Sequence, residues 1–467
     1  MIMKRQILLS IFLTFCTWAF AQFTTAGDGT TYSIQGLSYV ANAEVVPCEM
    51  EEGQTPVYML RKSITIAGGD RFVMDDGIVV QFDKDVTLTI EGDADFALSQ
   101  GSTFDSAYDG GSTLGSALCI KSATATTFEN CHFYYVGLEM MGEGGVTVRQ
   151  CSFHNHDGST AAALYFVSAG DESVVEDCHF EMCRKAAIGS AANASQPLTI
   201  QGCSFVKNSA ANGNVPQINI TAASPLCIKD CTITGNPDNT MVGGIGISNF
   251  MSYDADVTIS GCTITDNRYG IGLVGPAAKI RIENCVLKGN HYEQNPMNGG
   301  SGISLYDPYQ QTCAVITGNH IEGSLWGITV IGCQDVNIGR TDVPQDDERY
   351  NVGGNTFRDN GNGGVLYDLY NNSANTVYAQ NNTWNVSEQT EEQIETVIFH
   401  RHDDASLGEV IFWPAAAAMG LADEGLRMTD NNSASGSSDC YTLQGVPIKN
   451  PQKGIFIQHG KKIVKNN

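Results

Sequence analysis

The chain repeats a short pattern of alternating apolar and polar residues. The stretch VTISGCTITDNRYGIGL, residues 257–273, holds alternating segments on both sides of a cysteine, then an asparagine, a glycine and a further apolar segment. Alternation with a period of two places successive side chains on opposite faces of a β-strand. We therefore expect short strands here, with Val257, Ile259 and Ile264 pointing inward.

Near-copies of this unit recur along the chain. Aligned on their cysteines they read TTFENCHF, VTVRQCSF, SVVEDCHF, LTIQGCSF, LCIKDCTI, VTISGCTI and IRIENCVL, and an eighth copy, AVITGNHI, has Asn319 in that place. Successive copies lie 20 to 34 residues apart. Self-similarity at such a period indicates a solenoid or a related array.

The strand content of each unit narrows the architecture. A second apolar segment follows the cysteine unit, as in GIGISNF and GIGLVG, without a helical pattern between them. Leucine-rich repeats would show L-x-x-L-x-L and propeller blades four strands in about 40 residues, and the chain shows neither. Two or three short strands per unit fit one coil of a parallel β-helix.

The repeats resemble those of the right-handed parallel β-helix proteins, an architecture shared by pectate lyases and many bacterial surface proteins. The resemblance covers roughly residues 60–415. It implies an all-β fold, a right-handed parallel β-helix, with a cap at each end.

The cysteines of the repeats predict a buried column. Coils of a β-helix stack about 4.8 Å apart, so equivalent residues form ladders along the axis. A thiol is small and easily buried, and we expect a column of free thiols. Disulfides and a metal site with nearby histidines such as His154 and His179 are the alternatives, and we predict no metal. The column comprises Cys131, Cys151, Cys178, Cys203, Cys231, Cys262 and Cys285.

The ends of such a solenoid need covering, because open strand edges invite aggregation. We expect residues 22–60 to form the N-terminal cap. Residues 381–414, NNTWNVSEQTEEQIETVIFHRHDDASLGEVIFWP, resemble the closing segment of many bacterial β-helix proteins, which implies a short acidic helix over the last coil. We expect Ser387 to cap that helix. The β-helix with its closing cap then spans residues 61–415.

The first residues have the features of a secretory signal. MIMKRQILLSIFLTFCTWAFAQ combines a basic start, a short apolar core and an A-x-A cleavage site formed by Ala19 and Ala21. This predicts a signal peptide over residues 1–21 and a secreted or surface-exposed protein. No later run of about 18 apolar residues occurs, so we expect no transmembrane segment.

The composition changes at the C-terminal end. The stretch NNSASGSSDC is small and polar, which is typical of a linker, and we assign residues 416–440 to a linker. Residues 441–467 carry five lysines and no acidic residue, whereas the whole chain has a formal charge of −25. This tail resembles the C-terminal sorting signal of the type IX secretion system of Bacteroidetes, which implies a small β unit and the secretion machinery as a partner. The matching residues are Gly454, Ile455, Phe456, Ile457, Gly460, Lys461 and Lys462.

Charge and motifs limit the function without deciding it. The acidic surface argues against nucleic acid as a partner. Of the polygalacturonase motifs N-T-D, D-D, G-H-G and R-I-K, Asp238-Asn239-Thr240 and Arg281-Ile282-Glu283 are only fragments and G-H-G does not occur, so no catalytic residue can be assigned. Our first hypothesis is a monomeric, non-catalytic secreted or surface protein that binds glycans or other surface molecules without a cofactor. The alternative is a polysaccharide lyase or glycoside hydrolase of the pectate lyase and polygalacturonase-like superfamily, with Ca²⁺ only if it is a lyase.

Aromatic residues beside carboxylates supply the candidate binding site. The sequences YDPY and YDLY follow apolar segments two coils apart, and a tryptophan begins the coil between them. Aromatic rings offer sugars flat apolar faces, and carboxylates accept hydrogen bonds from hydroxyl groups. The alternative is that Tyr367 points into the core and the others are ordinary loop residues. The candidates are Tyr306, Asp307, Tyr309, Trp326, Asp368 and Tyr370.

Overall fold

A computed structural model describes residues 23–49, 51–107, 115–158 and 160–416, together with short strands between residues 440 and 465. The chain divides into two compact units, residues 1–418 and 419–467. The predicted cleavage residues Ala19 and Ala21, most of the predicted linker and Gly460 lie outside the described residues. Within the described part, no helix has both the length and the apolar character needed to cross a bilayer.

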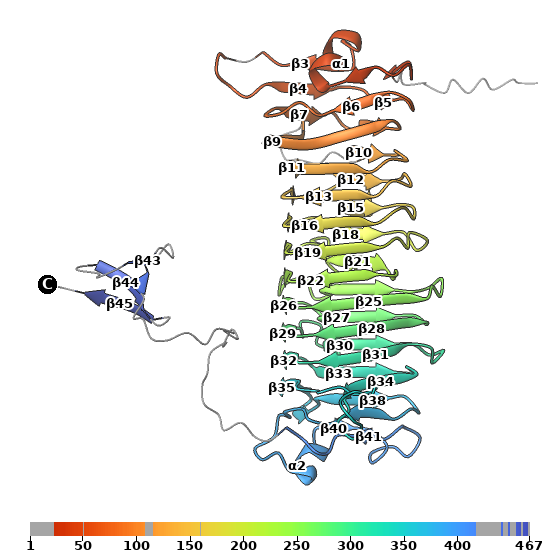
Figure 1. Cartoon of the computed structure of the whole chain (residues 1–467), viewed down its shortest axis with the longest axis vertical. Helices are drawn as coiled ribbons and strands as arrows, with labels where there is room; N and C mark the ends of the chain where they lie inside the picture. Colours follow the sequence, from red (N-terminus) through yellow and green to blue (C-terminus); the bar gives the residue numbers. More distant parts are fainter. Residues whose placement is uncertain are drawn as a thin grey trace, which may run out of the picture. The chain divides into compact units, whose positions relative to one another are not determined.

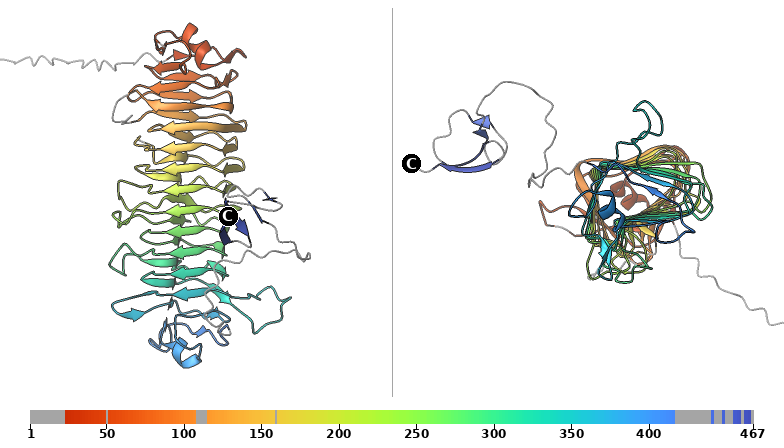
Figure 2. Two further views of the ribbon diagram at one scale, coloured as in Figure 1. Left: turned by 90° about the vertical axis from the view of Figure 1, so that its left-hand side faces the viewer. Right: turned by 90° about the horizontal axis from the view of Figure 1, so that it is seen from below.

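The first unit is a parallel β-helix, as the sequence predicts (Figure 1). One coil consists of β25 (Ala255–Ser260), β26 (Thr263–Thr265) and β27 (Ile271–Val274). Each strand pairs in parallel with its equivalent in the neighbouring coil, so the coils superpose when viewed along the axis (Figure 2). The three strands of a coil belong to three ladders, which we call ladders A, B and C.

Ladder A is a sheet of fourteen strands. Its members are β1 (Phe23–Thr24), β5 (Ile64–Ile66), β8 (Thr87–Ile90), β10 (Ala117–Ile120), β12 (Gly137–Met140), β15 (Ala162–Phe166), β18 (Ala186–Ser190), β21 (Ile218–Thr221), β24 (Ile245–Ser248), β27, β30 (Ser301–Tyr306), β33 (Trp326–Ile331), β38 (Leu369–Asn372) and β40 (Ile398–Phe399).

Ladders B and C share two long strands, β9 (Asp93–Ser106) and β11 (Thr126–Tyr134), which run through both. Ladder B also contains β2 (Thr31–Tyr32), β6 (Arg71–Val73), β13 (Val146–Arg149), β16 (Ser173–Glu176), β19 (Leu198–Gln201), β22 (Leu226–Lys229), β25, β28 (Ala278–Glu283), β31 (Cys313–Thr317), β34 (Asp335–Gly339), β39 (Val377–Ala379) and β41 (Val410–Ile411). Ladder C contains β3 (Val45–Pro47), β4 (Val57–Leu60), β7 (Val79–Phe82), β14 (Ser152–His154), β17 (His179–Glu181), β20 (Ser204–Val206), β23 (Thr232–Thr234), β26, β29 (Val286–Lys288), β32 (His320–Glu322) and β35 (Thr356–Arg358).

Inward side chains of the three ladders form one continuous core. Val257, Ile259 and Ile264 are buried, as their alternation predicts. In ladder C, equivalent phenylalanines stack almost face to face, with ring centroids 4.6 to 5.1 Å apart. Each such buried side chain contributes about 2–3 kcal/mol of hydrophobic stabilisation. The stacked rings are Phe133, Phe153, Phe180 and Phe205.

The corner between ladders B and C explains which residue precedes each repeat cysteine. That residue has a positive φ, between 50° and 62°, in all seven cysteine coils. Asn, Asp and Gly tolerate this left-handed conformation best, and six of the seven positions hold one of them. The positions are Asn130, Gln150, Asp177, Gly202, Asp230, Gly261 and Asn284.

Both ends of the β-helix are capped. Strands β1 and β2 already pair within ladders A and B, so the first coil begins at Phe23, earlier than the expected residue 61. Helix α1 (Ile34–Val40) then buries Ile34 and Leu37, and the Ser33 hydroxyl accepts a hydrogen bond from the Gly36 N–H.

At the other end, β36 (Gly361–Asn362) and β37 (Val365–Leu366) form a hairpin. Helix α2 (Glu391–Glu395) comes later in the chain, after β38 and β39. Its N-cap is Thr390, so the prediction of Ser387 is wrong. The helix begins too late for Ser387 to reach its first N–H groups, and the Ser387 hydroxyl instead donates to Gln393 Oε1.

The second unit contains four short antiparallel strands in the order β43-β42-β44-β45. They are β42 (Cys440–Tyr441), β43 (Pro447–Ile448), β44 (Gly454–Gln458) and β45 (Lys461–Lys465). Within the described residues, these strands pair with one another.

Candidate functional site

A cleft of about 830 Å³ lies on the outer face of ladder A. Its lining residues come from eight consecutive strands, β18 to β40, and from loops beside them. At about 4.8 Å per strand this corresponds to a length of about 34 Å. A groove of that length suits a polymer better than a single small molecule.

Small side chains in register form the floor of the cleft. One outward row of ladder A runs through glycine, asparagine, serine and threonine before it reaches an aromatic residue. Small groups leave depth above the sheet, and the aromatic residue bounds that depth towards the C-terminal coils. The row is Asn219, Gly246, Gly272, Ser304, Thr329 and Tyr370.

The glycines of the floor make room for Tyr269, which lies between β26 and β27. A Cβ at Gly246 would lie 3.3 Å from the Tyr269 hydroxyl oxygen and 2.6 Å from Pro216 Cγ, and one at Gly272 would lie 3.0 Å from Tyr269 Cε2. The Tyr269 ring therefore lies against the sheet. Burial raises the pKa of Tyr269 to about 12, so the phenol keeps its proton at neutral pH and can donate a hydrogen bond.

Four aromatic residues gather at the C-terminal part of the cleft. The Trp326 ring centroid lies 4.6 Å from that of Tyr367 and 5.2 Å from that of Tyr370. Tyr370 in turn meets Phe399 edge to face at 5.2 Å. The Trp326 indole N–H donates to the Pro296 carbonyl oxygen at 3.0 Å, which fixes the ring. We call Trp326, Tyr367, Tyr370 and Phe399 the aromatic platform.

Arg268 supplies the charge of the cleft and is the one charged residue among its described lining residues. Its guanidinium donates to the Asn214 side-chain oxygen and to the Asn298 carbonyl oxygen, so loops from different coils hold it. Its Nε atom is buried without a hydrogen-bond partner in the described structure. Carboxylates and imidazoles do not occur among the described lining residues.

The structure brings together two of the six predicted binding residues, Trp326 and Tyr370. Tyr306 is 42% exposed and lies in the neighbouring outward row, in register with Ile331, without lining the cleft. Tyr309 is 71% exposed and follows β30 in a loop outside the cleft.

The prediction is wrong for Asp307 and Asp368, because both are buried. The Asp307 carboxylate accepts hydrogen bonds from three backbone N–H groups, those of residues 309, 311 and 312, and so shapes a turn. The Asp368 carboxylate accepts from the Asn385 N–H and the Asn360 side chain. Burial outweighs these bonds and raises the pKa of Asp368 to about 7.

Sequence reasoning missed Arg268 and Tyr269 and left open whether Tyr367 points into the core. Tyr367 lines the cleft. The signal for the first two was their place in DNRYGIG, directly before a ladder A strand. Acidic residues of the loops between coils lie outside the cleft: Asp254 faces Lys279 at 3.9 Å, and Asp347 pairs with Arg349 at 2.6 Å.

The seven repeat cysteines occupy one buried column at the corner of ladders B and C. Each Sγ lies 3.2 to 3.7 Å from the carbonyl oxygen two residues earlier, which can accept the thiol proton. All thirteen cysteines of the described first unit are free of disulfides. Further along, asparagines take the column over, and each side-chain oxygen accepts the N–H of the equivalent residue one coil earlier. They are Asn319, Asn355 and Asn382.

A buried histidine, His156, follows β14 of ladder C. The His156 Nε2 lies 2.6 Å from the Thr160 hydroxyl, and its Nδ1 has no hydrogen-bond partner in the described structure. Burial, and then the charge of Lys185, lower the pKa of His156 to about 4. The folded state therefore holds this imidazole neutral where the unfolded chain, with a pKa of about 6.5, would protonate it.

We expect His156 to make stability depend on pH. Because its pKa is lower in the folded state, its contribution is complete above about pH 6.5 and is lost as the pH falls towards 4. The difference between these pKa values corresponds to about 3 kcal/mol. Denaturant unfolding of wild type and His156→Asn, measured from pH 7 to pH 4, should show the wild-type advantage shrinking by about that amount. A difference that stays constant across this range would contradict the assignment.

The comparisons with known proteins agree with the observed architecture. The family model described as "Right handed beta helix region" matches residues 71–214 and 206–307, which is more than half of the chain. A comparison with curated proteins found no match.

Among solved structures, the periplasmic alginate epimerase AlgG is similar at 10% identity, with 83% of each chain covered and a TM-score of 0.41. The A-module of the mannuronan C-5 epimerase AlgE4 of Azotobacter vinelandii is similar at 11% identity, with 84% of this chain and 90% of that chain covered and a TM-score of 0.22. These similarities concern the fold alone.

Proposed function

The chain belongs to the right-handed beta-helix family, and on this fold we propose that the cleft of ladder A binds a polysaccharide chain. The observation that carries the proposal is the aromatic platform of Trp326 and its neighbours at one part of a long, mostly uncharged groove. Rings pack against the apolar faces of sugars, and the amides and hydroxyls of the floor match sugar hydroxyl groups.

An enzyme acting on the same polymer is the second candidate, as the sequence-based alternative had it. Arg268 beside Tyr269 favours it, because a cation can neutralise a sugar carboxylate while a phenol exchanges a proton. The absence of a carboxylate or imidazole among the described lining residues favours binding alone.

We expect Trp326→Ala to weaken binding to the recognised polysaccharide about 10- to 30-fold, because it removes the central ring of the platform. The measurement is isothermal titration with soluble alginate, polygalacturonate and a neutral glucan. Tyr309→Ala is the matched control, since it removes an exposed ring outside the cleft. Equal affinity of Trp326→Ala and wild type for every polymer that binds would contradict the proposal, as would the absence of any binding.

Product analysis separates the two candidates. The bound polymer is incubated with wild type and with Arg268→Gln, and the products are assayed for new reducing ends, for unsaturated sugars and for changed uronate composition. Binding without any product supports the non-catalytic function. A product that disappears in Arg268→Gln supports the enzyme.

We also propose that the protein is exported to the cell surface or the medium. The predicted signal peptide over residues 1–21 would direct the first membrane crossing, and the lysine-rich second unit would then serve as the address read by the secretion machinery. Its strands pair with one another, which supports a role separate from that of the β-helix.

A further inference from the structure

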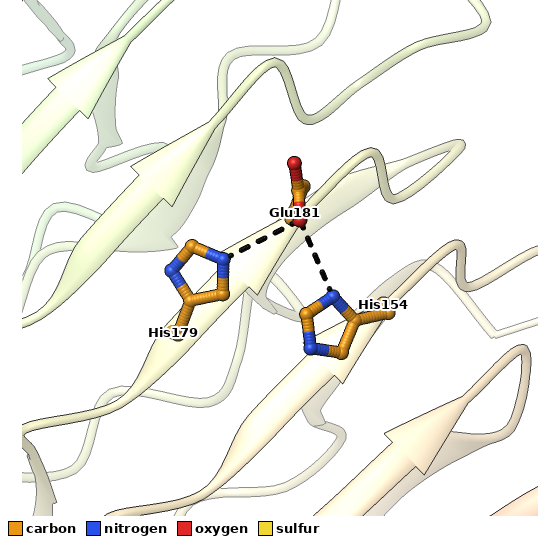
Figure 3. A group of neighbouring side chains, drawn as sticks. All are labelled: His154, His179 and Glu181. Carbon is orange, nitrogen blue, oxygen red and sulfur yellow. Dashed lines mark ion pairs between the residues drawn. The ribbon is translucent and has the colours of Figure 1, made fainter.

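The outer face of ladder C gathers two imidazoles and a carboxylate, whereas the cleft lies on ladder A. His154 of β14 is in register with Glu181 of β17. His179 lies two residues before Glu181 on the same strand, so its side chain projects from the same face. Figure 3 shows both imidazoles turned towards the Glu181 carboxylate. We call these three residues the His-His-Glu cluster.

The separations within the cluster fit a central ion better than direct hydrogen bonds. Glu181 Oε2 lies 3.5 Å from His154 Nδ1 and 3.6 Å from His179 Nε2, which is within ion-pair distance but beyond the usual hydrogen-bond range of about 2.7–3.2 Å. All three ligand atoms lie within 4.8 Å of one another. Metal–ligand bonds of about 2.1 Å in a tetrahedron place neighbouring ligand atoms about 3.4 Å apart.

The scaffold of the cluster is pre-organised, and its outer side is open. The cluster and the residues next to it lie on three neighbouring parallel strands, β11, β14 and β17. The His154 ring stacks on Tyr134, with ring centroids 4.9 Å apart. Beneath, the stacked Phe153 and Phe180 rings anchor the same two strands. The side chains of His154, His179 and Glu181 are 20%, 38% and 44% exposed, so an ion can enter from solvent.

We propose that His154, His179 and Glu181 bind a first-row transition-metal dication of the Zn²⁺ type. Two imidazole nitrogens and one carboxylate oxygen suit Zn²⁺, whereas Ca²⁺ and Mg²⁺ prefer six or more oxygen ligands. Three protein ligands leave one tetrahedral position for water or for a donor atom of a bound molecule. The proposal replaces the sequence-based prediction of no metal, which considered the residue types without knowing their register.

His132 provides a matched control on the same face. It lies in the row of Ser152 and His179, but its Nδ1 bonds the Ser152 hydroxyl at 2.9 Å. His132→Ala therefore removes an imidazole of this surface without removing a ligand.

The test is Zn²⁺ titration of the chain without its predicted signal peptide, residues 22–467, after treatment with a chelator. We expect one equivalent to bind to wild type and to His132→Ala. In His179→Ala and Glu181→Gln the affinity should fall more than about 100-fold, since even changes around a ligand shell cost 10- to 100-fold. A 100-fold excess of Ca²⁺ should not displace Zn²⁺. Equal affinity in all four proteins would overturn the proposal.

Two further measurements keep the test valid if a variant folds poorly or if thiols bind the metal. In wild type, Zn²⁺ should slow the modification of His154 and His179 by diethyl pyrocarbonate but not that of His402, whose side chain is 74% exposed. The Co²⁺ form should show visible ligand-field bands without a thiolate charge-transfer band. Unprotected histidines or a thiolate band would place the ion elsewhere and refute the site.

Discussion

Replacing Cys203 by Asp should destabilise the β-helix by about 3–5 kcal/mol at neutral pH. The Cys203 side chain is buried in the column between Cys178 and Cys231. Its Sγ lies 3.2 Å from the Gln201 carbonyl oxygen and 3.5 Å from the Val175 carbonyl oxygen. A carboxylate in this place would face these two carbonyl oxygens, which are hydrogen-bond acceptors, and no cation. Either an unpaired charge is then buried, or the coil opens.

Three other substitutions at Cys203 isolate the charge from the change of shape. Cys203→Asn has nearly the size of Asp and is the residue that fills this column at Asn319 and Asn355, so it should cost much less than Cys203→Asp. Cys203→Ser keeps a donor for the same carbonyl oxygens and should also be mild. Cys203→Ala leaves a small cavity and should cost about 1–2 kcal/mol.

Urea unfolding of these variants at pH 7 and pH 4 provides the measurement. The gap between Cys203→Asp and Cys203→Asn should narrow at the lower pH, because protonation removes the buried charge. Equal stability of the two variants at pH 7 would show that the column admits water or rearranges. Rapid labelling of the native column thiols by a small reagent would contradict its burial independently.

The fold could be predicted because each coil of the β-helix repeats the same pattern of residues. The alternation around Val257 and Ile259 set the inward face, and each repeat cysteine marked one corner. The residue before that cysteine needs a left-handed backbone, which is why Asn, Asp or Gly recurs there. Signals that repeat along the chain remain readable even when the loops between them vary.

The candidate site could be predicted only in part, because it depends on register between coils that lie far apart in the sequence, 41 residues in the case of Thr329 and Tyr370. Trp326 and Tyr370 meet because Thr329 and Tyr370 are register partners. Asp307 looked like a sugar ligand beside a tyrosine, but a carboxylate can equally satisfy the N–H groups of its own turn. Alternation alone does not distinguish these uses.

The His-His-Glu cluster could not be predicted from the sequence for the same reason, because it also depends on register between coils. In the sequence, His154 and Glu181 are separated by a whole coil, and nothing local links them. Parallel pairing of β14 and β17 places them opposite each other. Variable loop lengths hide that pairing until the strands are aligned in space.

Removing residues 419–467 should abolish delivery to the cell surface or medium and leave the β-helix folded. Strands β42 to β45 pair antiparallel with one another, whereas β40 and β41 complete ladders A and B without them. The first unit therefore needs no strand from the second, and the melting temperature of the truncated protein should stay within about 2 °C of wild type.

The experiment is fractionation of the native host that expresses either the full chain or the truncated one, with a melting curve of each purified protein. We expect the truncated protein to accumulate in the periplasm. In the full-length chain, Lys461→Ala combined with Lys462→Ala tests the address without removing the unit and should reduce export in the same direction. Truncated protein that still reaches the surface would refute the sorting function. A melting temperature that falls by many degrees would instead assign the second unit to the stability of the fold, because a pure address contributes nothing to the folded coils.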